Sequence, residues 1–132
     1  MPGIDECLLE TMRVPGARGA ALVDWTSGLA LGAVGDTPGG DHEATAAETA
    51  EFARAAAEHP SFAPGPDAEP AGAAPPVEDV LVTTGTGYHL LHFVATAFDS
   101  SVFLYLWLDR DQGNLALARR CLRDLAGQLV PA

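Results

Sequence analysis

Apolar and polar positions along the chain predict a helix followed by a β-hairpin at the N-terminus. Apolar residues recur at helical spacing over Ile4–Arg13, and Pro15 ends that helix. Two short apolar runs, Ala20–Val23 and Leu29–Val34, then flank a polar turn. Gly28 stands where a hairpin loop of this length needs a residue with positive φ. The chain therefore opens with one helix and two antiparallel strands.

The middle of the chain predicts a second helix and then a loop. Asp41 is a suitable N-cap for a helix that runs to about Glu58, and Pro60 ends it. This helix consists mostly of Ala and Glu, and Phe52 is its only large apolar residue. Residues 59–76, HPSFAPGPDAEPAGAAPP, have no periodicity. We expect them to form an exposed, partly extended and flexible loop.

The remainder of the chain predicts three strands and a helix. The strands are Val77–Thr84, Tyr88–Ala97 and Ser101–Asp109, separated by short turns, and the helix is Gln112–Val130 with one apolar stripe. Apolar residues occupy both faces of the last strand, so both faces of the sheet must be covered. The sequence therefore predicts one α+β domain over residues 1–132. It is a three-layer sandwich of order α-β-β-α-β-β-β-α, with a five-stranded, mainly antiparallel sheet, one helix on one face and two on the other.

Composition and charge narrow the range of partners. The 48% of hydrophobic residues argues against a disordered chain. The formal net charge of −11 disfavours nucleic acids and anionic membranes as partners. The stretch Tyr88–Leu108 has the length of a membrane span, but Asp99 interrupts it, so two buried strands explain it better. The N-terminus lacks the basic and apolar regions of a signal peptide, which predicts a cytoplasmic protein.

Candidate metal and catalytic motifs are incomplete. His42 and Glu43 begin like a zinc-protease helix, but Ala46 stands where the second histidine is needed. His89 and His92 are three residues apart on a predicted strand and so face opposite sides of it. Cys7 and Cys121 fall on different predicted helices, where each is expected to behave as a small buried apolar residue.

Two glycine- and aspartate-containing turns also lack a complete motif. Residues 85–87, GTG, join two strands and lack the Lys and Ser/Thr of a phosphate-binding loop. Residues 109–114, DRDQGN, start like a calcium loop, but Arg120 replaces its last acidic ligand. The sequence therefore predicts no catalytic residue, no metal and no cofactor, and we expect the protein not to be an enzyme.

Three features are candidates for binding. Small residues on the middle helix permit close approach of a partner helix, or packing on the chain's own sheet; they are Ala46, Ala47, Ala50, Ala53 and Ala57. The apolar run Val80, Leu81 and Val82 lies on a strand expected at a sheet edge, which favours a homodimer. Trp25 at the hairpin tip is either a contact for a partner or folded back on its own domain.

Three short stretches carry a family resemblance: residues 14–23, VPGARGAALV, residues 27–31, SGLAL, and residues 114–120, NLALARR. On these motifs the chain bears a resemblance to the Roadblock/dynein light chain family, as a bacterial member. It implies a dimeric scaffold or regulator of Ras-like GTPases or motor complexes, with no catalytic residue of its own. Residues 59–76 depart from the family pattern just before the strand that forms the dimer edge in the family.

The resemblance implies a non-enzymatic cytosolic adaptor that acts on a small Ras-like GTPase or an associated signalling protein. The alternative is a sensor that binds a small ligand between sheet and helices, near Tyr88, Phe103 and Tyr105. Arginines cluster near the last helix, where Arg120 and Asp124 have the spacing of a helical ion pair; the four are Arg110, Arg119, Arg120 and Arg123. We expect them to serve the helix and not to act as an arginine finger.

Overall fold

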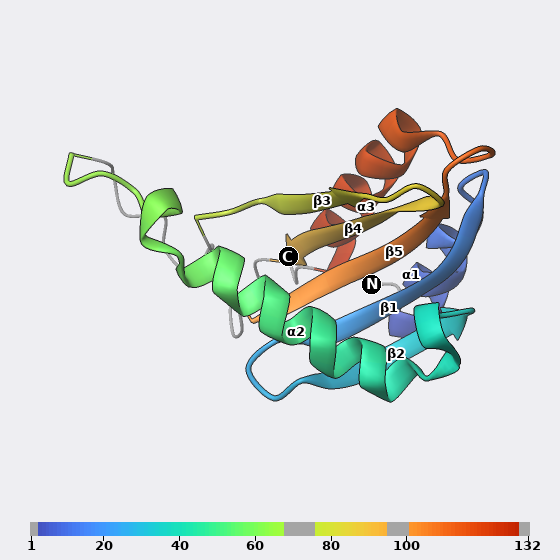
Figure 1. Cartoon of the computed structure of the whole chain (residues 1–132), viewed down its shortest axis with the longest axis horizontal. Helices are drawn as coiled ribbons and strands as arrows, with labels where there is room; N and C mark the ends of the chain where they lie inside the picture. Colours follow the sequence, from blue (N-terminus) through green and yellow to red (C-terminus); the bar gives the residue numbers. More distant parts are fainter. Residues whose placement is uncertain (1–2, 68–75, 95–100, 130–132) are drawn as a thin grey trace.

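The computed structural model describes residues 3–67, 76–94 and 101–129 of the 132-residue chain. Within these ranges it contains three α-helices, two short 3₁₀ turns and five strands (Figure 1). In chain order they are α1 (Ile4–Thr11), β1 (Ala17–Asp24), β2 (Leu29–Gly35), η1 (Pro38–Gly40), α2 (His42–Glu58), η2 (Pro60–Phe62), β3 (Asp79–Thr83), β4 (Gly87–Val94), β5 (Val102–Asp109) and α3 (Leu115–Leu129).

The five strands form one antiparallel sheet in the order β2-β1-β5-β4-β3. The central strand β5 pairs with β1 on one side and with β4 on the other, so β2 and β3 are the edges. Gly28 in the β1–β2 turn has a φ of 78°, which a glycine adopts without the steric cost that a side chain adds. The predicted antiparallel sheet and its first hairpin are confirmed.

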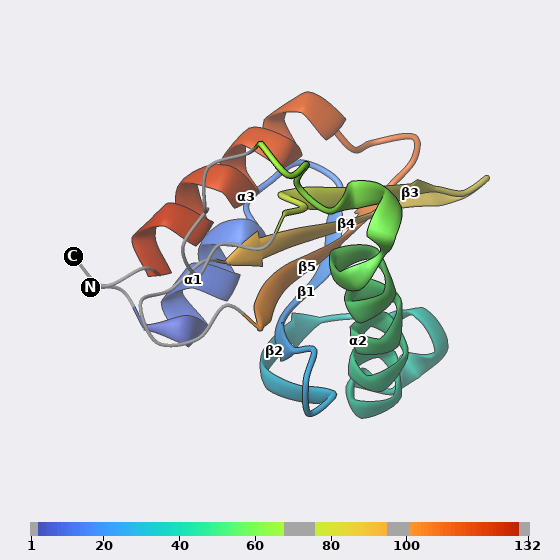
Figure 2. The same cartoon turned by 90° about the vertical axis from the view of Figure 1, so that its left-hand side faces the viewer.

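Helices cover both faces of the sheet (Figure 2). The helices α1 and α3 lie on one face, where Leu8 and Leu122 pack with Leu104 and Leu106 in the first core cluster. The helix α2 lies on the other face, over a second cluster that includes Phe103. The strand residues alternate between these two clusters, which is why both sides of the central strands are apolar. The predicted three-layer arrangement, with one helix on one face and two on the other, is confirmed.

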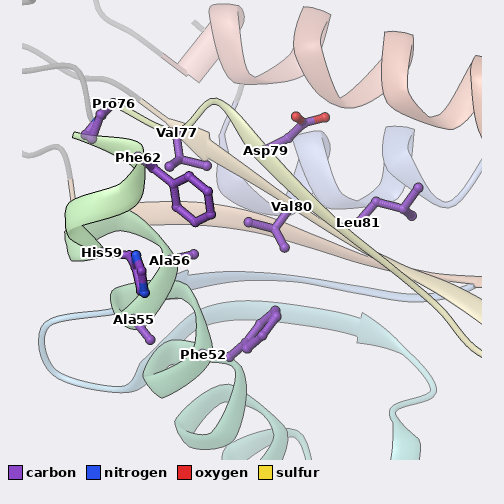
Figure 3. A pocket seen from close by; sticks show the side chains of 10 residues that line it. All are labelled: Phe52, Ala55, Ala56, His59, Phe62, Pro76, Val77, Asp79, Val80 and Leu81. Carbon is purple, nitrogen blue, oxygen red and sulfur yellow. The ribbon is translucent and has the colours of Figure 1, made fainter. Parts of the chain in front are cut away.

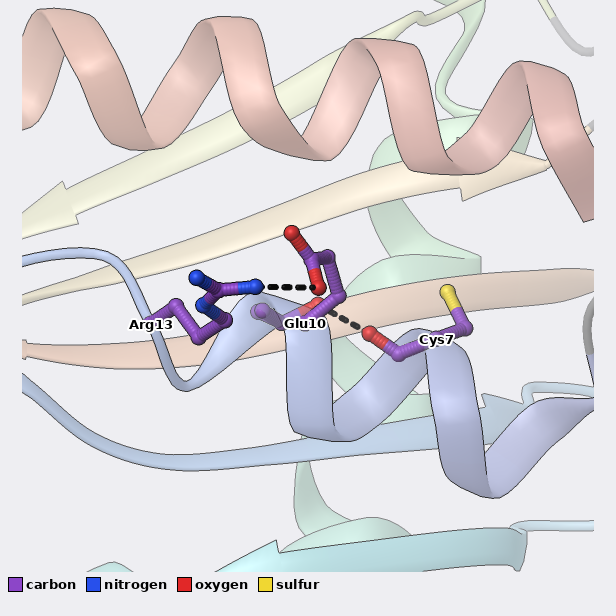
Figure 4. Close-up of polar contacts among 4 residues, drawn as sticks. Cys7, Glu10 and Arg13 are labelled. Carbon is purple, nitrogen blue, oxygen red and sulfur yellow. Dashed lines mark hydrogen bonds and ion pairs between the residues drawn. The ribbon is translucent and has the colours of Figure 1, made fainter.

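Helix α1 is short and is held by its packing against α3 and the sheet. The Thr11 hydroxyl donates a 2.9 Å hydrogen bond to the Cys7 carbonyl, and an exposed ion pair joins Arg13 and Glu10 at 3.4 Å (Figure 4). The Cys7 side chain extends toward α3 and is buried, and Cys121 packs against the same cluster. Burial raises the pKa of the Cys7 thiol, as expected for a cysteine that acts as a small apolar residue.

Several predicted boundaries need correction. The first helix ends at Thr11, and the third strand begins at Asp79, two residues later than the pattern predicts. Residues 60–62, expected within an extended loop, form the 3₁₀ turn η2. Residues 68–75, 95–97 and 130 of the predicted loop, fourth strand and last helix lie outside the described residues. The structure contains no described helix with both the length and the apolar character needed to cross a bilayer.

Candidate functional site

A wide apolar groove lies where the end of α2 and the turn η2 pass the start of the edge strand β3 (Figure 3). Its volume is about 830 Å³. It is lined by Phe52, Ala55, Ala56, His59, Phe62, Pro76, Val77, Asp79, Val80 and Leu81. Most of these lining side chains are apolar, so the groove is suited to another apolar surface and offers few hydrogen-bonding groups to a polar ligand.

One wall of the groove is built by α2 and η2. The Asp41 carboxylate caps α2 by accepting hydrogen bonds from the N–H groups of Glu43 and Ala44, at 2.9 and 3.3 Å. Phe52 projects from α2 into the groove beside β3 and is 46% exposed (Figure 3). Phe62 is 56% exposed, and its ring lies 5.3 Å from the His59 ring. Phe52 and Phe62 are therefore two large, partly exposed apolar side chains on the same wall of the groove.

The other wall is the edge strand β3. Val80 packs on the α2-side core, while Leu81 is 38% exposed. In the described sheet β3 has a neighbouring strand on one side only, so its outer edge is free to pair with another strand. Asp79 carries the one carboxylate of the groove lining, and it points away to form a 3.0 Å ion pair with Arg119 of α3 (Figure 3). The groove thus stays apolar.

The five alanines predicted as a contact face of the middle helix differ in burial. Ala46, Ala50, Ala53 and Ala57 are buried against the chain's own sheet, so the alternative of sheet packing accounts for them. Among the five predicted residues, only Ala47 is exposed. The small side chains let α2 lie close to the sheet. These four alanines pack on the chain's own sheet, and a dimer interface on this helix stays a prediction.

Trp25 follows the second of its two alternatives. Its ring is half-buried and packs against the α2-side core cluster, so the structure shows it folded back on its own domain. The indole N–H is buried and has no hydrogen-bond partner among the described residues. The ring therefore serves the packing of its own domain, and a contact of Trp25 with a partner stays a prediction.

The histidines lie on separate elements or on separate faces. His42 hydrogen-bonds the Gly35 carbonyl at 2.9 Å. His89 lies on the α2 side, with its Nδ1 2.8 Å from the Tyr105 hydroxyl. Burial lowers the pKa of His92, against the opposing charge of Asp79. No group of three potential metal ligands occurs among the described residues.

His89 is expected to titrate below the ordinary histidine pKa of 6.5, because burial disfavours its charged form. Between the lowered pKa and 6.5, the unfolded chain binds more protons than the folded chain. Stability should therefore fall as the pH falls through this window. An NMR titration of the His89 ring, compared with the same resonance in denaturant, measures both values. A folded pKa at or above 6.5 contradicts the prediction.

The three residues suggested for a ligand sensor do not line one pocket. Phe103 and Tyr105 are buried in the α2-side core, with exposures of 0% and 3%. Tyr88 packs against the opposite core cluster, on the α1 and α3 side. These side chains pack in the two cores, and the small-ligand alternative stays a prediction.

Sequence reasoning missed Phe62, Pro76 and Val77 as parts of the groove. The signal available was the isolation of Phe52 and Phe62 as large apolar residues in stretches of Ala, Glu and Pro. Their common location depends on η2 turning back beside β3, which no local pattern specifies (Figure 3).

Comparisons with known proteins agree with this architecture. No protein-family model and no curated protein sequence matches the chain. The structure is similar to a Roadblock/LC7 domain from Streptomyces avermitilis, with a TM-score of 0.69 and 17% identity, covering 97% of this chain and 95% of that one. It is also similar to Myxococcus xanthus MglB, with a TM-score of 0.72 and 16% identity over 97% of this chain and 94% of that one.

The chain has the Roadblock fold. A third similar structure, described as MglB with tetrameric arrangement, has a TM-score of 0.71 and 20% identity, and covers 98% of this chain and 90% of that one. The Roadblock fold matches the expected α-β-β-α-β-β-β-α order, so the resemblance drawn from the short motifs is confirmed at the level of fold.

Proposed function

We propose that this protein is a cytoplasmic, non-enzymatic regulator of a small Ras-like GTPase, built from one Roadblock domain and active as a homodimer. The main observation in support of this proposal is the groove between α2 and the edge strand β3. It combines an open strand edge with exposed apolar side chains at Phe52, Phe62 and Leu81. Antiparallel pairing of two β3 strands would extend the sheet and bring the groove residues of both copies together.

Charge and similarity to known structures also support self-association. The groove carries no unpaired carboxylate among its lining residues, because Asp79 is bound to Arg119. The residues that line the groove therefore add no free carboxylate to the proposed contact between two chains of net charge −11. One similar structure is an MglB in a tetrameric arrangement, which shows that this fold is compatible with assembly in that protein.

The GTPase assignment rests on the Roadblock fold and on the family resemblance of the sequence. Light scattering at micromolar concentration tests the dimer, and a monomer there counts against it. Capture from native lysate on the immobilised protein tests the partner, with GTP- and GDP-loaded lysates compared. A nucleotide-dependent small GTPase supports the proposal, whereas a co-purifying metabolite with no GTPase favours the sensor.

Any stimulation of GTP hydrolysis is expected to come from ordering of the partner, without an arginine finger from this chain. Arg119 is tied to Asp79, and the Arg110 guanidinium donates a 2.7 Å hydrogen bond to the Thr84 carbonyl. The predicted pair of Arg120 with Asp124 does not form in the described structure.

Single alanine variants of Arg110, Arg119, Arg120 and Arg123 should therefore leave stimulated GTP hydrolysis within about tenfold of the wild type, since loss of a true finger costs ~10³-fold or more. Single-turnover hydrolysis with the captured GTPase measures this. A thousandfold loss in any one variant would show that an arginine finger is present.

A further inference from the structure

A row of side chains crosses the α2 side of the sheet at the end where β5 finishes. Val82, His89 and Trp107 occupy paired positions on β3, β4 and β5, and all three are half-buried. The His89 and Trp107 rings are stacked, with centroids 6.2 Å apart and an interplanar angle of 9°. Arg18 of β1 completes the row, with its guanidinium carbon 3.8 Å from the centre of the Trp107 ring.

None of the three described helices covers the sheet at this row. The helix α2 starts beside β2 and runs diagonally across the sheet (Figure 1). It leaves the end of β3, the start of β4 and the end of β5 open on this face. Next to the row is a hollow of about 350 Å³, which Arg18 and Trp107 line together with the loop from Gly35 to Gly40. Trp107 therefore forms the floor of an open site whose rim carries a cation.

The cation is held in place without a carboxylate partner. The protein has 18 acidic residues against 7 basic ones, yet no ion pair joins Arg18 to any described carboxylate. Asp36 lines the same hollow; its N–H donates a 2.8 Å hydrogen bond to the Arg18 carbonyl, and its carboxylate forms no ion pair with Arg18. Stacking on Trp107 orients the planar guanidinium and leaves its edge donors available.

We propose that Arg18 and the Val82–His89–Trp107 row form a docking site for a protein partner that presents a carboxylate side chain between apolar residues. The guanidinium edge would receive the carboxylate through charge-assisted hydrogen bonds, and Trp107 and Val82 would contact the flanking apolar side chains. Charge complementarity selects this occupant, because the site offers a cation that forms no ion pair with any described carboxylate, in a protein of net charge −11. Val82 lies on the edge strand β3, whereas Arg18, His89 and Trp107 lie outside the groove lining, and the site requires no GTPase.

The test uses ¹H–¹⁵N NMR of the full chain with a short acetylated peptide that carries one glutamate between leucines. The Trp107 indole resonance should shift, while that of Trp25, packed in the core, serves as the internal reference. The same peptide with glutamine in place of glutamate should shift it far less. Inorganic phosphate at equal concentration should leave it in place.

Two variants complete the test. Arg18→Gln should weaken glutamate-peptide binding about tenfold or more, as expected for loss of a hydrogen bond to a charged group. Arg13→Gln removes the same charge from the distant helix α1, where Arg13 pairs with Glu10, and should leave binding unchanged. The proposal is overturned by equal shifts with the glutamate and glutamine peptides, by an equal response to phosphate, or by unchanged binding in Arg18→Gln. Absence of any Trp107 shift at millimolar peptide overturns it as well.

Discussion

Replacing Phe52 with glutamate is expected to raise the dissociation constant of the homodimer by about 100-fold, since loss of a central apolar contact costs ~2 kcal/mol or more and the new charge must also be desolvated. Phe52 is 46% exposed and lines the groove between α2 and β3. Glutamate is a good helix former, so α2 itself should persist. Sedimentation equilibrium over a range of concentrations measures the constant.

Leu117→Glu is the matched control for this variant. Leu117 is 44% exposed on a helix, as Phe52 is 46% exposed, but it lies on α3, away from the groove. It should leave the dissociation constant unchanged. If both variants dissociate to the same extent, added negative charge is responsible and the groove is not the interface. Circular dichroism of both variants establishes that the helices remain folded.

Replacing Phe103 with alanine is expected to lower the free energy of unfolding by about 3–5 kcal/mol, the usual cost of an aromatic cavity in a closed core. Phe103 is fully buried on the central strand β5, and its ring meets Phe93 edge to face at 6.2 Å. Because a domain of this size is stable by only ~5–15 kcal/mol, this variant loses a large share of its stability. Urea unfolding at one fixed protein concentration measures the loss, since dimerisation makes stability depend on concentration.

Leu9→Ala is the control for the core variant. Leu9 is an apolar residue that is 59% exposed on α1, so truncating it should change stability by no more than about 0.5 kcal/mol. Similar losses in the two variants would mean that Phe103 is not packed as the structure shows. The comparison therefore tests whether the α2-side cluster is the core.

Local patterns were sufficient for most of the fold. The two-sided apolar alternation of the strands and the capping role of Asp41 depend on residues close together in the chain. Where a local signal was weak, the prediction was displaced: the first helix stops at Thr11, and η2 forms inside the segment expected to be an extended loop. For Trp25 and for the alanines of the middle helix the sequence allowed two alternatives, packing within the chain or contact with a partner, because each residue type suits both.

The sequence by itself determined the order of the elements, the covered antiparallel sheet and the absence of a complete local catalytic or metal-binding motif, because each is specified by spacing along the chain. Only the tertiary structure decided which surfaces remain open. Phe52 and Leu81 line the same groove, and Arg18 stacks on Trp107 in the second site. In each pair the two residues come from elements that are distant in sequence. Such neighbours depend on the strand order β2-β1-β5-β4-β3 and on the diagonal path of α2. Those are consequences of long-range packing, which no local period encodes.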